Sequence, residues 1–485
     1  MRSSRRISFA GWNAAAGQPA ELDVDVKALV ERLKGVDVDN LVGKRDKVEE
    51  PVPEQSAPKK TKRALAPRRP GPSNEPEKPE IGRWAIVVLE DDADQAEEAL
   101  RPLIEHRIGQ GVAFHAPNTQ PKRGIIRMPS VVSANPERWR RALEESTGGK
   151  LPYYLLLVGG PRRIPFDVQM ALEQGFATGR IDAGAGVDGA GDWDAYRVWA
   201  DKLVRYETGK MDVERRALLY SFATDDATRR SHAELSEPLA AYLDDLGRIL
   251  PSKPLEPKRL FGHDATTARL CLEVEKSRPA VIVTASHGLE WFDSPNPRED
   301  WGALTDEGFS GTTGTALDAA RVRQCASFAP GAVMVSFACF SAGVPAESVH
   351  RLLYQKAPNA IAGAPYTSAL PRALLAHPNG PVAFVGHVDR ATSESFQARG
   401  PEEGPAAFID FIQWSLGGQG TLGQAMSGFR EQCGAAAVKL AQTLARARKR
   451  PEVATSKEAL DAWIRYHDAA GYVLLGDPVM KLVMA

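Results

Sequence analysis

The chain carries a series of short apolar runs, separated by longer stretches with helical character. Each run is continuous rather than alternating, which is typical of strands buried on both faces of a parallel sheet. The runs occupy residues 83–90, 152–160, 216–226, 280–288, 331–340, 359–366, 380–387 and 471–482. Because such strands alternate with helices, the pattern predicts an α/β fold with a mostly parallel sheet and helices on both faces. Beyond residue 400 the chain is expected to be mainly helical before the last strand.

The N-terminal part has a different pattern. Residues 22–35 carry apolar side chains at helical spacing and predict a short amphipathic helix within an N-terminal segment, 1–48. These apolar positions are Val26, Leu29, Val30 and Leu33. One short helix cannot hold a fold by itself, so it is expected to dock on the main domain or, less favourably, on a partner. Residues 49–80 are rich in proline and charge and predict an extended linker.

Composition narrows the class of protein. Hydrophobic residues make up 43% of the 485, enough for a sizeable core. The 61 basic and 62 acidic residues nearly balance, which argues against a nucleic-acid-binding protein. The four cysteines are widely spaced, which argues against a disulfide scaffold and a structural zinc site. The chain has no signal-like and no membrane-spanning apolar run, so a cytoplasmic protein without membrane attachment is expected. No metal and no cofactor are expected either.

Two of the predicted strands end in reactive side chains. One strand ends at Ser286-His287-Gly288, and a later one ends at Ala338-Cys339. The carboxyl ends of parallel strands form the ligand-binding edge of an open sheet, so both side chains are expected at its solvent-accessible rim. An imidazole and a thiol at neighbouring strand ends can form a nucleophilic dyad, in which the imidazole takes the thiol proton. The backbone N–H groups of Gly288 and Cys339 are then candidates for an oxyanion hole.

Each of these residues also has a simpler interpretation. A histidine at a strand end is often without chemistry, and a free cysteine is often a buried core residue. Cys271 lies in an apolar helical stretch and is read as core, while Cys325 and Cys433 lack a nearby histidine signature. The acidic loop from Asp182 to Asp194 leaves calcium binding open, although the EF-hand pattern is not met. No serine nucleophile elbow and no Walker A motif occurs.

With these strand ends in hand, the chain resembles the gingipain family of the caspase clan of cysteine peptidases. The similar segments are 153–166, 176–207, 281–291, 335–343, 380–386 and 472–482. The resemblance spans roughly residues 83–485 and implies a caspase-like α/β/α sandwich. It implies two consecutive subdomains, 81–210 and a catalytic 211–485. It also implies endopeptidase activity with Cys339 as nucleophile and His287 as general acid and base.

The resemblance also suggests, less specifically, how substrate is chosen. In family members that cut after arginine, an acidic residue lies at the base of the specificity pocket, and Asp167 is the nearest candidate here, with Glu173 second. The alternative, that Asp167 caps a turn or helix, stays open. Trp291 and Trp301 could line the pocket or simply pack their loop. The sequence Phe-Ala-Cys-Phe-Ser departs from the Gln-Ala-Cys of caspases, which puts a preference for aspartate in doubt.

The expected function is therefore cleavage of proteins or peptides through a Cys339–His287 dyad, after Arg or Lys. Activation by a partner protein or by processing of the linker is a further hypothesis, and the alternative, that the linker is only a tether, stays open. Arg63 is the favoured processing position, because it lies in an extended segment and is not followed by proline. The rival hypothesis is a catalytically silent caspase-fold scaffold that acts through its N-terminal helix and linker.

Overall fold

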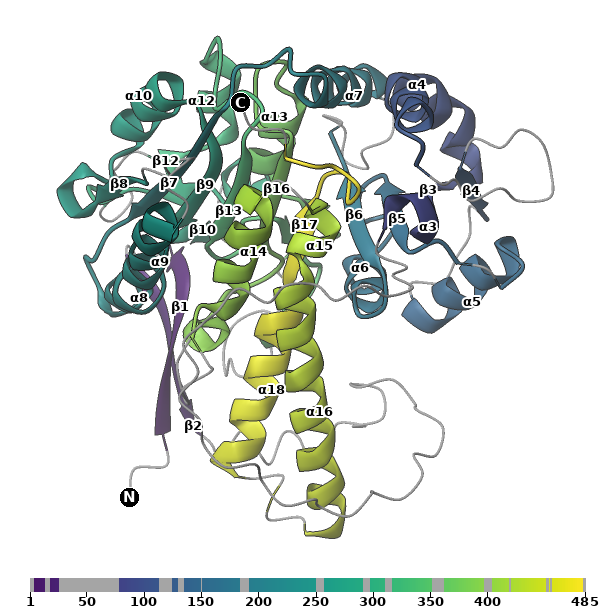
Figure 1. Ribbon diagram of the computed structural model, residues 1–485. Coiled ribbons are helices and arrows are strands. Elements are labelled where there is room, and N and C mark those ends of the chain that lie inside the picture. Colours follow the sequence, from purple (N-terminus) through teal and green to yellow (C-terminus); the bar gives the residue numbers. More distant parts are fainter. Residues whose placement is uncertain are drawn as a thin grey trace.

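A ten-stranded sheet forms the centre of the computed structural model, in the order β4-β3-β5-β6-β17-β16-β13-β9-β7-β8 (Figure 1). The structure describes residues 4–13, 18–25, 78–112, 124–129, 135–149, 151–183, 192–249, 257–290, 297–309, 316–350, 362–396, 404–417, 420–450, 453 and 456–482. The strands are β3 (Trp84–Leu89), β4 (Ile125–Met128), β5 (Tyr154–Val158), β6 (Ala177–Ile181), β7 (Glu214–Ser221), β8 (Lys258–Phe261), β9 (Pro279–Ala285), β13 (Val333–Phe337), β16 (Ala383–His387) and β17 (Tyr472–Leu475). Among their pairings only β16–β17 is antiparallel, which confirms the predicted α/β fold with a mostly parallel sheet.

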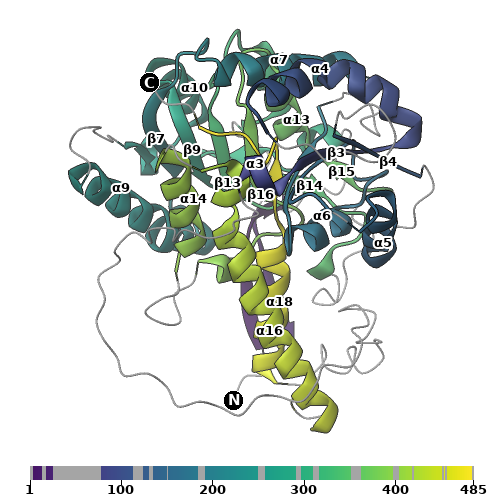
Figure 2. The same ribbon diagram turned by 45° about the vertical axis from the view of Figure 1, so that its right-hand side comes forward.

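Helices cover both faces of this sheet (Figures 1 and 2). Along one face α4, α7, α13 and α12 pack side by side, and the other face carries α5, α6, α15, α14 and α9. Their bounds are α4 (Ala93–Gly109), α5 (Pro136–Ser146), α6 (Phe166–Glu173), α7 (Trp193–Glu207), α9 (Glu237–Ile249), α12 (Ala319–Gln324), α13 (Ala369–Ala376), α14 (Ala406–Gly417) and α15 (Leu422–Ala425). In β3, Ile86 packs into the core with α4, while Val87 packs into a second core with α5 and α6. Both faces of the strand are buried, which explains the continuous apolar run.

The C-terminal part of the chain adds a long helical pair, as expected. Helices α16 (Ser427–Lys449) and α18 (Lys457–Ala470) pack against one another and project away from the sheet (Figure 1). Four further helices lie in the connections between strands in the described part of the chain. They are α3 (Pro79–Gly82), α8 (Asp226–Ser231), α10 (Thr267–Ser277) and α11 (Pro297–Asp300). None of the helices in the described part of the chain is long and apolar enough to cross a membrane.

A second, smaller sheet holds the N-terminus against the main body. Its order is β12-β11-β10-β1-β2. The bounds are β1 (Ser4–Asn13), β2 (Gln18–Asp25), β10 (Gly288–Glu290), β11 (Leu304–Thr305) and β12 (Ala316–Leu317). The chain is a strand as far as Asp25, so the predicted helix 22–35 is wrong over its first four residues. Leu22 and Val24 alternate with Asp23 and Asp25, the period of a strand. The rest of that helix, and linker residues 49–77, lie outside the described residues.

Another sequence expectation also needs correction. Residues 359–366 were expected to add a strand to the main sheet, but residues 362–365 are irregular. Tyr366 belongs instead to the two-residue strand β15 (Tyr366–Thr367), which pairs only with β14 (Gly343–Val344). The two expected subdomains share the main sheet: 81–210 supplies β3–β6, and 211–485 supplies the other six strands. The division into subdomains remains a prediction.

The strand order places a topological switch point at one end of the sheet. From β7 the chain first adds β8 on the outer side, then returns so that β9 pairs on the inner side of β7. The next strands, β13 and β16, continue inward from β9. The order therefore reverses between β7 and β9, and the carboxyl ends of strands at such a reversal form a crevice that binds ligands.

Candidate active site

Three side chains with groups suited to catalysis follow the carboxyl ends of β7, β9 and β13. The parallel pairing of β9 with β13 runs to Ala285 opposite Phe337. His287 and Cys339 each lie two residues beyond this last pair. Gly288, the residue after His287, lies close to the backbone of Cys339, because a Cβ built on Gly288 would lie only 1.8 Å from the carbonyl oxygen of Cys339. The structure therefore brings together the two residues on which the sequence analysis depends.

Asp225, which the sequence analysis missed, is the third member of the group. It follows β7, caps the N-terminus of α8, and accepts from His287 Nε2 through Oδ2 at 2.7 Å. Its Oδ1 accepts from the backbone N–H groups of Ala227 and Thr228 at 2.9 and 3.0 Å. Burial would raise the pKa of Asp225, but the bond to His287 and the imidazole charge, with the bonds from Thr228, lower it to about 2. The carboxylate is thus ionised at neutral pH and fixes the orientation of the imidazole.

The signal for Asp225 was present in the sequence. The run at 216–226 is apolar and ends in Thr-Asp-Asp, so its polar end follows the same rule that singled out His287 and Cys339. What the sequence could not supply is the strand order, which makes β7 the immediate neighbour of β9.

Cys339 is more deeply placed than expected. Its side chain is 0% exposed and that of His287 is 1% exposed, so the expectation that both lie at a solvent-accessible rim is wrong. The thiol Sγ lies 3.7 Å from the carbonyl oxygen of Ala391. Burial raises the pKa of Cys339 well above its usual value; Glu290 raises it further, whereas Arg390 lowers it. In this closed arrangement the thiol is protonated at neutral pH.

The turn after Cys339 stores backbone strain. Phe340 has φ +55° and Asp389, which follows β16, has φ +77°. The Phe340 N–H donates to the carbonyl oxygen of Asp389 at 2.7 Å, so one strained residue holds the other. The Asp389 carboxylate is fixed in turn by Ser348 Oγ at 2.8 Å and by the Val349 N–H at 2.7 Å. Non-glycine residues in this backbone region persist where the surrounding structure over-determines them, and they cluster at functional sites.

A buried ion pair lies beside the thiol. Arg390 donates to Glu290 through Nε at 3.0 Å and through Nη2 at 2.9 Å, and both side chains are about 3% exposed or less. The guanidinium also lies over the ring of Phe340, 5.4 Å from its centroid. The pair joins β10 to the segment after β16, so the elements on both sides of Cys339 are held together.

The reason for glycine at position 288 is more specific than the sequence suggested. A glycine lets its backbone N–H approach a substrate closely, but the close neighbour of Gly288 in this structure is the backbone of Cys339. Gly302 is similar, since a Cβ there would meet the carbonyl oxygen of Phe340. Donation from the Gly288 and Cys339 N–H groups to an oxyanion stays a prediction.

The two acidic candidates for a specificity pocket differ in their surroundings. Asp167 lies in the first turn of α6, and its neighbour Phe166 packs on Gly343, four residues beyond Cys339. The Asp167 side chain is exposed, yet the surrounding protein desolvates the carboxyl group enough to raise its pKa. Glu173 is buried, and burial raises its pKa to about 8 although Gln169 Nε2 donates to it at 3.0 Å. Asp167 therefore remains the better candidate.

The aromatic candidates were Trp291 and Trp301. Trp291 lies outside the described residues. Trp301 is 2% exposed and packs edge-to-face on Phe340, with ring centroids 4.8 Å apart. It thus packs its loop onto the turn after Cys339, the simpler of the two interpretations.

The remaining cysteines lie away from this group. Cys271 on α10 and Cys325 at the end of α12 are half-buried, and Cys433 on α16 is buried. Cys271, which the sequence places in the core, packs against the core from α10 and is partly buried. No group of three or more His, Cys, Asp or Glu side chains suited to a metal ion occurs in the described ranges. Asp182 is buried, and the loop 184–191 lies outside them.

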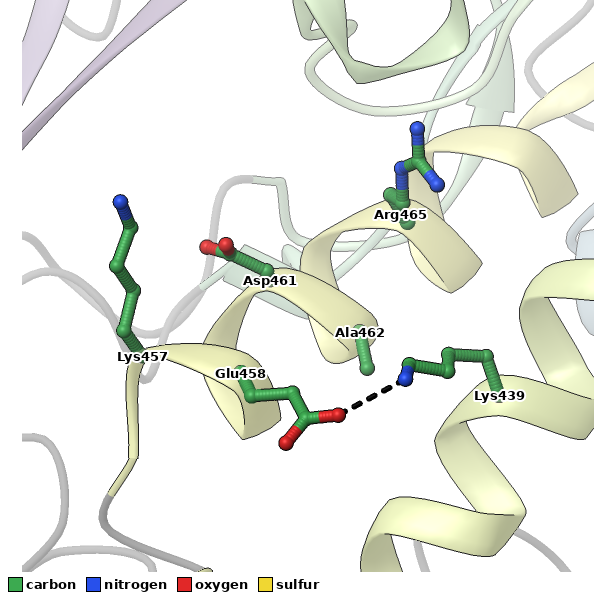
Figure 3. Close-up of a pocket in the computed structure, with 6 residues that line it drawn as sticks. All are labelled: Lys439, Lys457, Glu458, Asp461, Ala462 and Arg465. Atoms are coloured by element: carbon green, nitrogen blue, oxygen red, sulfur yellow. Dashed lines mark hydrogen bonds and ion pairs between the residues drawn. The ribbon is translucent and has the colours of Figure 1, made fainter. Parts of the chain in front are cut away.

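A hollow lies between α16 and α18 (Figure 3). Glu458 points to Lys439, whose Nζ lies 2.8 Å from Oε1, and Arg446 donates to the same carboxylate at 2.7 Å. The hollow is lined mainly by charged side chains of these helices, and no cysteine, serine or histidine lines it. It therefore offers no second thiol–imidazole pair.

Comparisons with known proteins assign no family. No family model matches the chain, and no curated protein matches it. Among solved structures, a leucine-binding protein from Thermotoga maritima is 11% identical, with 82% of this chain and 93% of that chain covered and a TM-score of 0.18. A fatty acid ABC transporter substrate-binding protein from Thermomonospora curvata is also 11% identical, covering 82% and 85%, with a TM-score of 0.17. TM-scores this low carry no argument about fold or function.

Proposed function

We propose that the protein is a cysteine endopeptidase of the caspase clan, similar to gingipains, with Cys339 as nucleophile and His287 as general base. The observation that carries the proposal is the hydrogen bond of 2.7 Å between Asp225 and His287, at the switch point of the sheet and beside the backbone of Cys339. A base oriented by a third group, next to a nucleophile, is the recurring arrangement of covalent catalysis. The α/β/α layering supports the caspase-like assignment.

The chemistry follows from the tautomer that Asp225 selects. With Nε2–H donating to the carboxylate, Nδ1 of His287 is the nitrogen that accepts the thiol proton. The Cys339 thiolate then attacks the peptide carbonyl, and the N–H groups of Gly288 and Cys339 stabilise the oxyanion. His287 returns the proton to the leaving amine, and water, activated by the same imidazole, hydrolyses the thioester. No metal or cofactor is required.

Substrates are proposed to be proteins or peptides cut after arginine or lysine. The support is Asp167, a carboxylate in the first turn of α6, close in the chain to the contact of Phe166 with Gly343. A desolvated carboxylate binds a guanidinium through two parallel hydrogen bonds and selects against neutral side chains. The four free cysteines are consistent with the cytoplasm as the proposed place of action.

The pocket proposal predicts a selective defect. Asp167→Ala should lower kcat/KM about 10²-fold or more for peptides with arginine before the scissile bond, because a charge-assisted pair is lost. Peptides with neutral residues there should be cut at an unchanged rate. Asp201→Ala, which removes an exposed carboxylate from α7, is the matched control. Equal losses on both classes of peptide would contradict a role for Asp167 in specificity.

The second candidate is a catalytically silent scaffold of the same fold. One observation favours it, since Cys339 is fully buried and its thiol is protonated in this arrangement. A buried thiol has few routes to a substrate.

A peptidyl probe with a thiol-reactive group, varied at the residue before the scissile bond, separates the two candidates. The peptidase predicts labelling at Cys339 and peptide cleavage, both abolished by Cys339→Ala. Loss of a nucleophile or its base typically costs about 10³-fold or more in rate. His287→Ala should abolish cleavage as well, whereas Cys271→Ala should leave it intact. Cleavage that survives in Cys339→Ala would contradict the mechanism, and a wild-type chain that is neither labelled nor active would favour the scaffold.

A further inference from the structure

The N-terminal strand lies against the candidate active site. β1 pairs in parallel with β10, in a register that sets Gly11 opposite Gly288, Trp12 opposite Leu289 and Asn13 opposite Glu290. β10 begins directly after His287. The segment of β1 just before Gly11 therefore passes at the level of the imidazole-bearing residue.

The other neighbours of β1 also belong to this site. β1 contacts α8, whose N-terminal cap is Asp225. It also contacts the short helix Ser393–Ser395, which follows Ala391, the acceptor of the thiol hydrogen bond. Figure 1 shows β1, in purple, passing β10 and α8 at this end of the large sheet. The strand thus runs across the carboxyl ends of β7, β9 and β16, the edge that carries the proposed chemistry.

The pairing of β1 changes where it meets β10. From Ser4 to Ser8 it follows β2 in regular antiparallel register, and the register then shifts between Ser8 and Trp12. Residues 9–11 are the stretch that faces His287 and Gly288 in register, and they lie within this irregularity. The irregularity thus lies at the start of the stretch that pairs with β10, and pairing with β2 resumes at Trp12, opposite Pro19.

We infer that the β10 edge binds the main chain of an extended polypeptide substrate, and that in the intact protein β1 occupies this edge and closes the site. The inference rests on the proposed function for the identity of the substrate. Proteins commonly bind extended peptides by adding a strand to an exposed sheet edge, where main-chain hydrogen bonds supply the affinity. β1 provides such a strand from the same chain, and the complete burial of Cys339 is what an occupied edge would produce.

The connection between β2 and the main body determines how strongly β1 competes with a substrate for the β10 edge. A strand joined to the body by residues 26–77 rebinds as an intramolecular ligand, at an effective concentration that free peptides must exceed. Cleavage of that connection makes rebinding bimolecular. The processing expected near Arg63 would then be an opening step, in which the hairpin β1–β2 can dissociate.

Alkylation of Cys339 tests the closure independently of peptide cleavage. The rate with iodoacetamide is measured at each cysteine by mass spectrometry, for the full chain and for a variant without residues 1–25. If β1 leaves the site open one-tenth of the time or less, the deletion should raise the Cys339 rate about 10-fold or more. Cys271, half-buried on α10, is the internal control and should react at an unchanged rate. A synthetic peptide of residues 4–25 should restore protection, and a scrambled peptide should not.

A second variant covers the case in which the deletion fails to fold. Trp12→Pro in the full chain removes an N–H and disfavours a strand, so it should loosen β1 and raise Cys339 reactivity. Ala15→Pro, between the two strands in sequence, is its control. Unchanged Cys339 reactivity in folded variants, or a measurable rate of peptide cleavage that is equal for the intact and deleted chains, would overturn the closure. Increased reactivity without any cleavage would support the closure and contradict the peptidase.

Discussion

Arg107 on α4 and His287 after β9 are both buried and both pair with a carboxylate, but the two environments differ. Arg107 donates to Asp477 through Nε at 2.9 Å and through Nη2 at 2.7 Å, and it also donates to Glu207. Asp477 accepts a further bond from Trp84 Nε1 at 3.0 Å. The network joins α4, α7 and the end of β17, and its fixed donors and acceptors match closely.

At the site on the other end of the sheet, hydrogen-bond donors and acceptors are less completely matched. His287 is fixed by Asp225, but the nearby Cys339 thiol has a single long hydrogen bond to a carbonyl group and a raised pKa. A strained turn at Phe340 and a glycine that admits the Cys339 carbonyl complete the group. Burial of charge alone therefore does not mark a functional site. The marks are an oriented base, a nucleophile and strain, gathered at the switch point.

The largest expected effect is on activity, and it comes from replacing Asp225, which orients the base His287. Asp225→Asn should lower kcat/KM about 10²- to 10⁴-fold, because an amide neither holds the imidazole tautomer nor stabilises the imidazolium. Asparagine still caps a helix, so α8 should persist and unfolding should stay cooperative, with a loss of stability no larger than the contribution of the ion pair, about 2 kcal/mol. Steady-state kinetics and thermal unfolding on the same samples measure both. Activity within threefold of wild type would remove Asp225 from the mechanism.

The same carboxylate should give a signature in the acid stability of the fold. Its folded pKa, about 2, lies below the ordinary value of 3.8, so the stabilisation is present above about pH 4 and is lost as pH falls towards 2. The contribution is of order 2 kcal/mol. Urea unfolding between pH 2 and 6 should therefore show a steeper acid loss for wild type than for Asp225→Asn. Parallel curves would mean that the pair forms equally in the unfolded chain.

Substitution in the Arg107 network should lower stability and leave activity unchanged, the opposite of the main effect expected for Asp225→Asn. Arg107→Ala leaves two buried carboxylates without their cation and should lower the free energy of unfolding by about 3–5 kcal/mol. The kcat/KM of the molecules that remain folded should be unchanged, since the network lies apart from β9 and β13. Arg127→Ala is the control, because Arg127 pairs with Glu90 and Asp94 at the surface and should cost about 1 kcal/mol or less. Equal costs for the two variants would show that burial adds nothing to the network.

Continuous apolar runs predicted most of the central strands because their burial on both faces gives a strong signal. The runs at 83–90, 280–288 and 331–340 became β3, β9 and β13, whereas strands β4, β6 and β8 were not predicted. Those three are short or interrupted by charged residues, as in the Ile-Ile-Arg-Met of β4. A local pattern also cannot give strand direction, so the antiparallel pairing of β17 was not foreseen.

The site was predictable in its two reactive residues and not in what surrounds them. His287 and Cys339 could be found because each follows an apolar run. Their burial could not, because it depends on partners distant in sequence, among them the pairing of Gly11 with Gly288. The helix expected at 22–35 shows the same difficulty, since a short amphipathic stretch can satisfy both periods until tertiary pairing decides.

The smallest effects compare glycines at the two ends of the sheet. A methyl group at Gly288 would overlap the Cys339 carbonyl, with 1.8 Å between the atoms, so the backbone of one segment must shift. Gly288→Ala should therefore cost about 1–3 kcal/mol of stability, as overpacking does, and should also displace the nucleophile. Gly175, just after α6, has no atom within 4 Å of the position that a methyl group would take, and its φ is not positive. Gly175→Ala should raise stability by about 0.4–1 kcal/mol, because it restricts the unfolded chain. Chemical denaturation measures both changes. Equal effects of the two substitutions would show that the tight contact between Gly288 and Cys339 is not formed in solution.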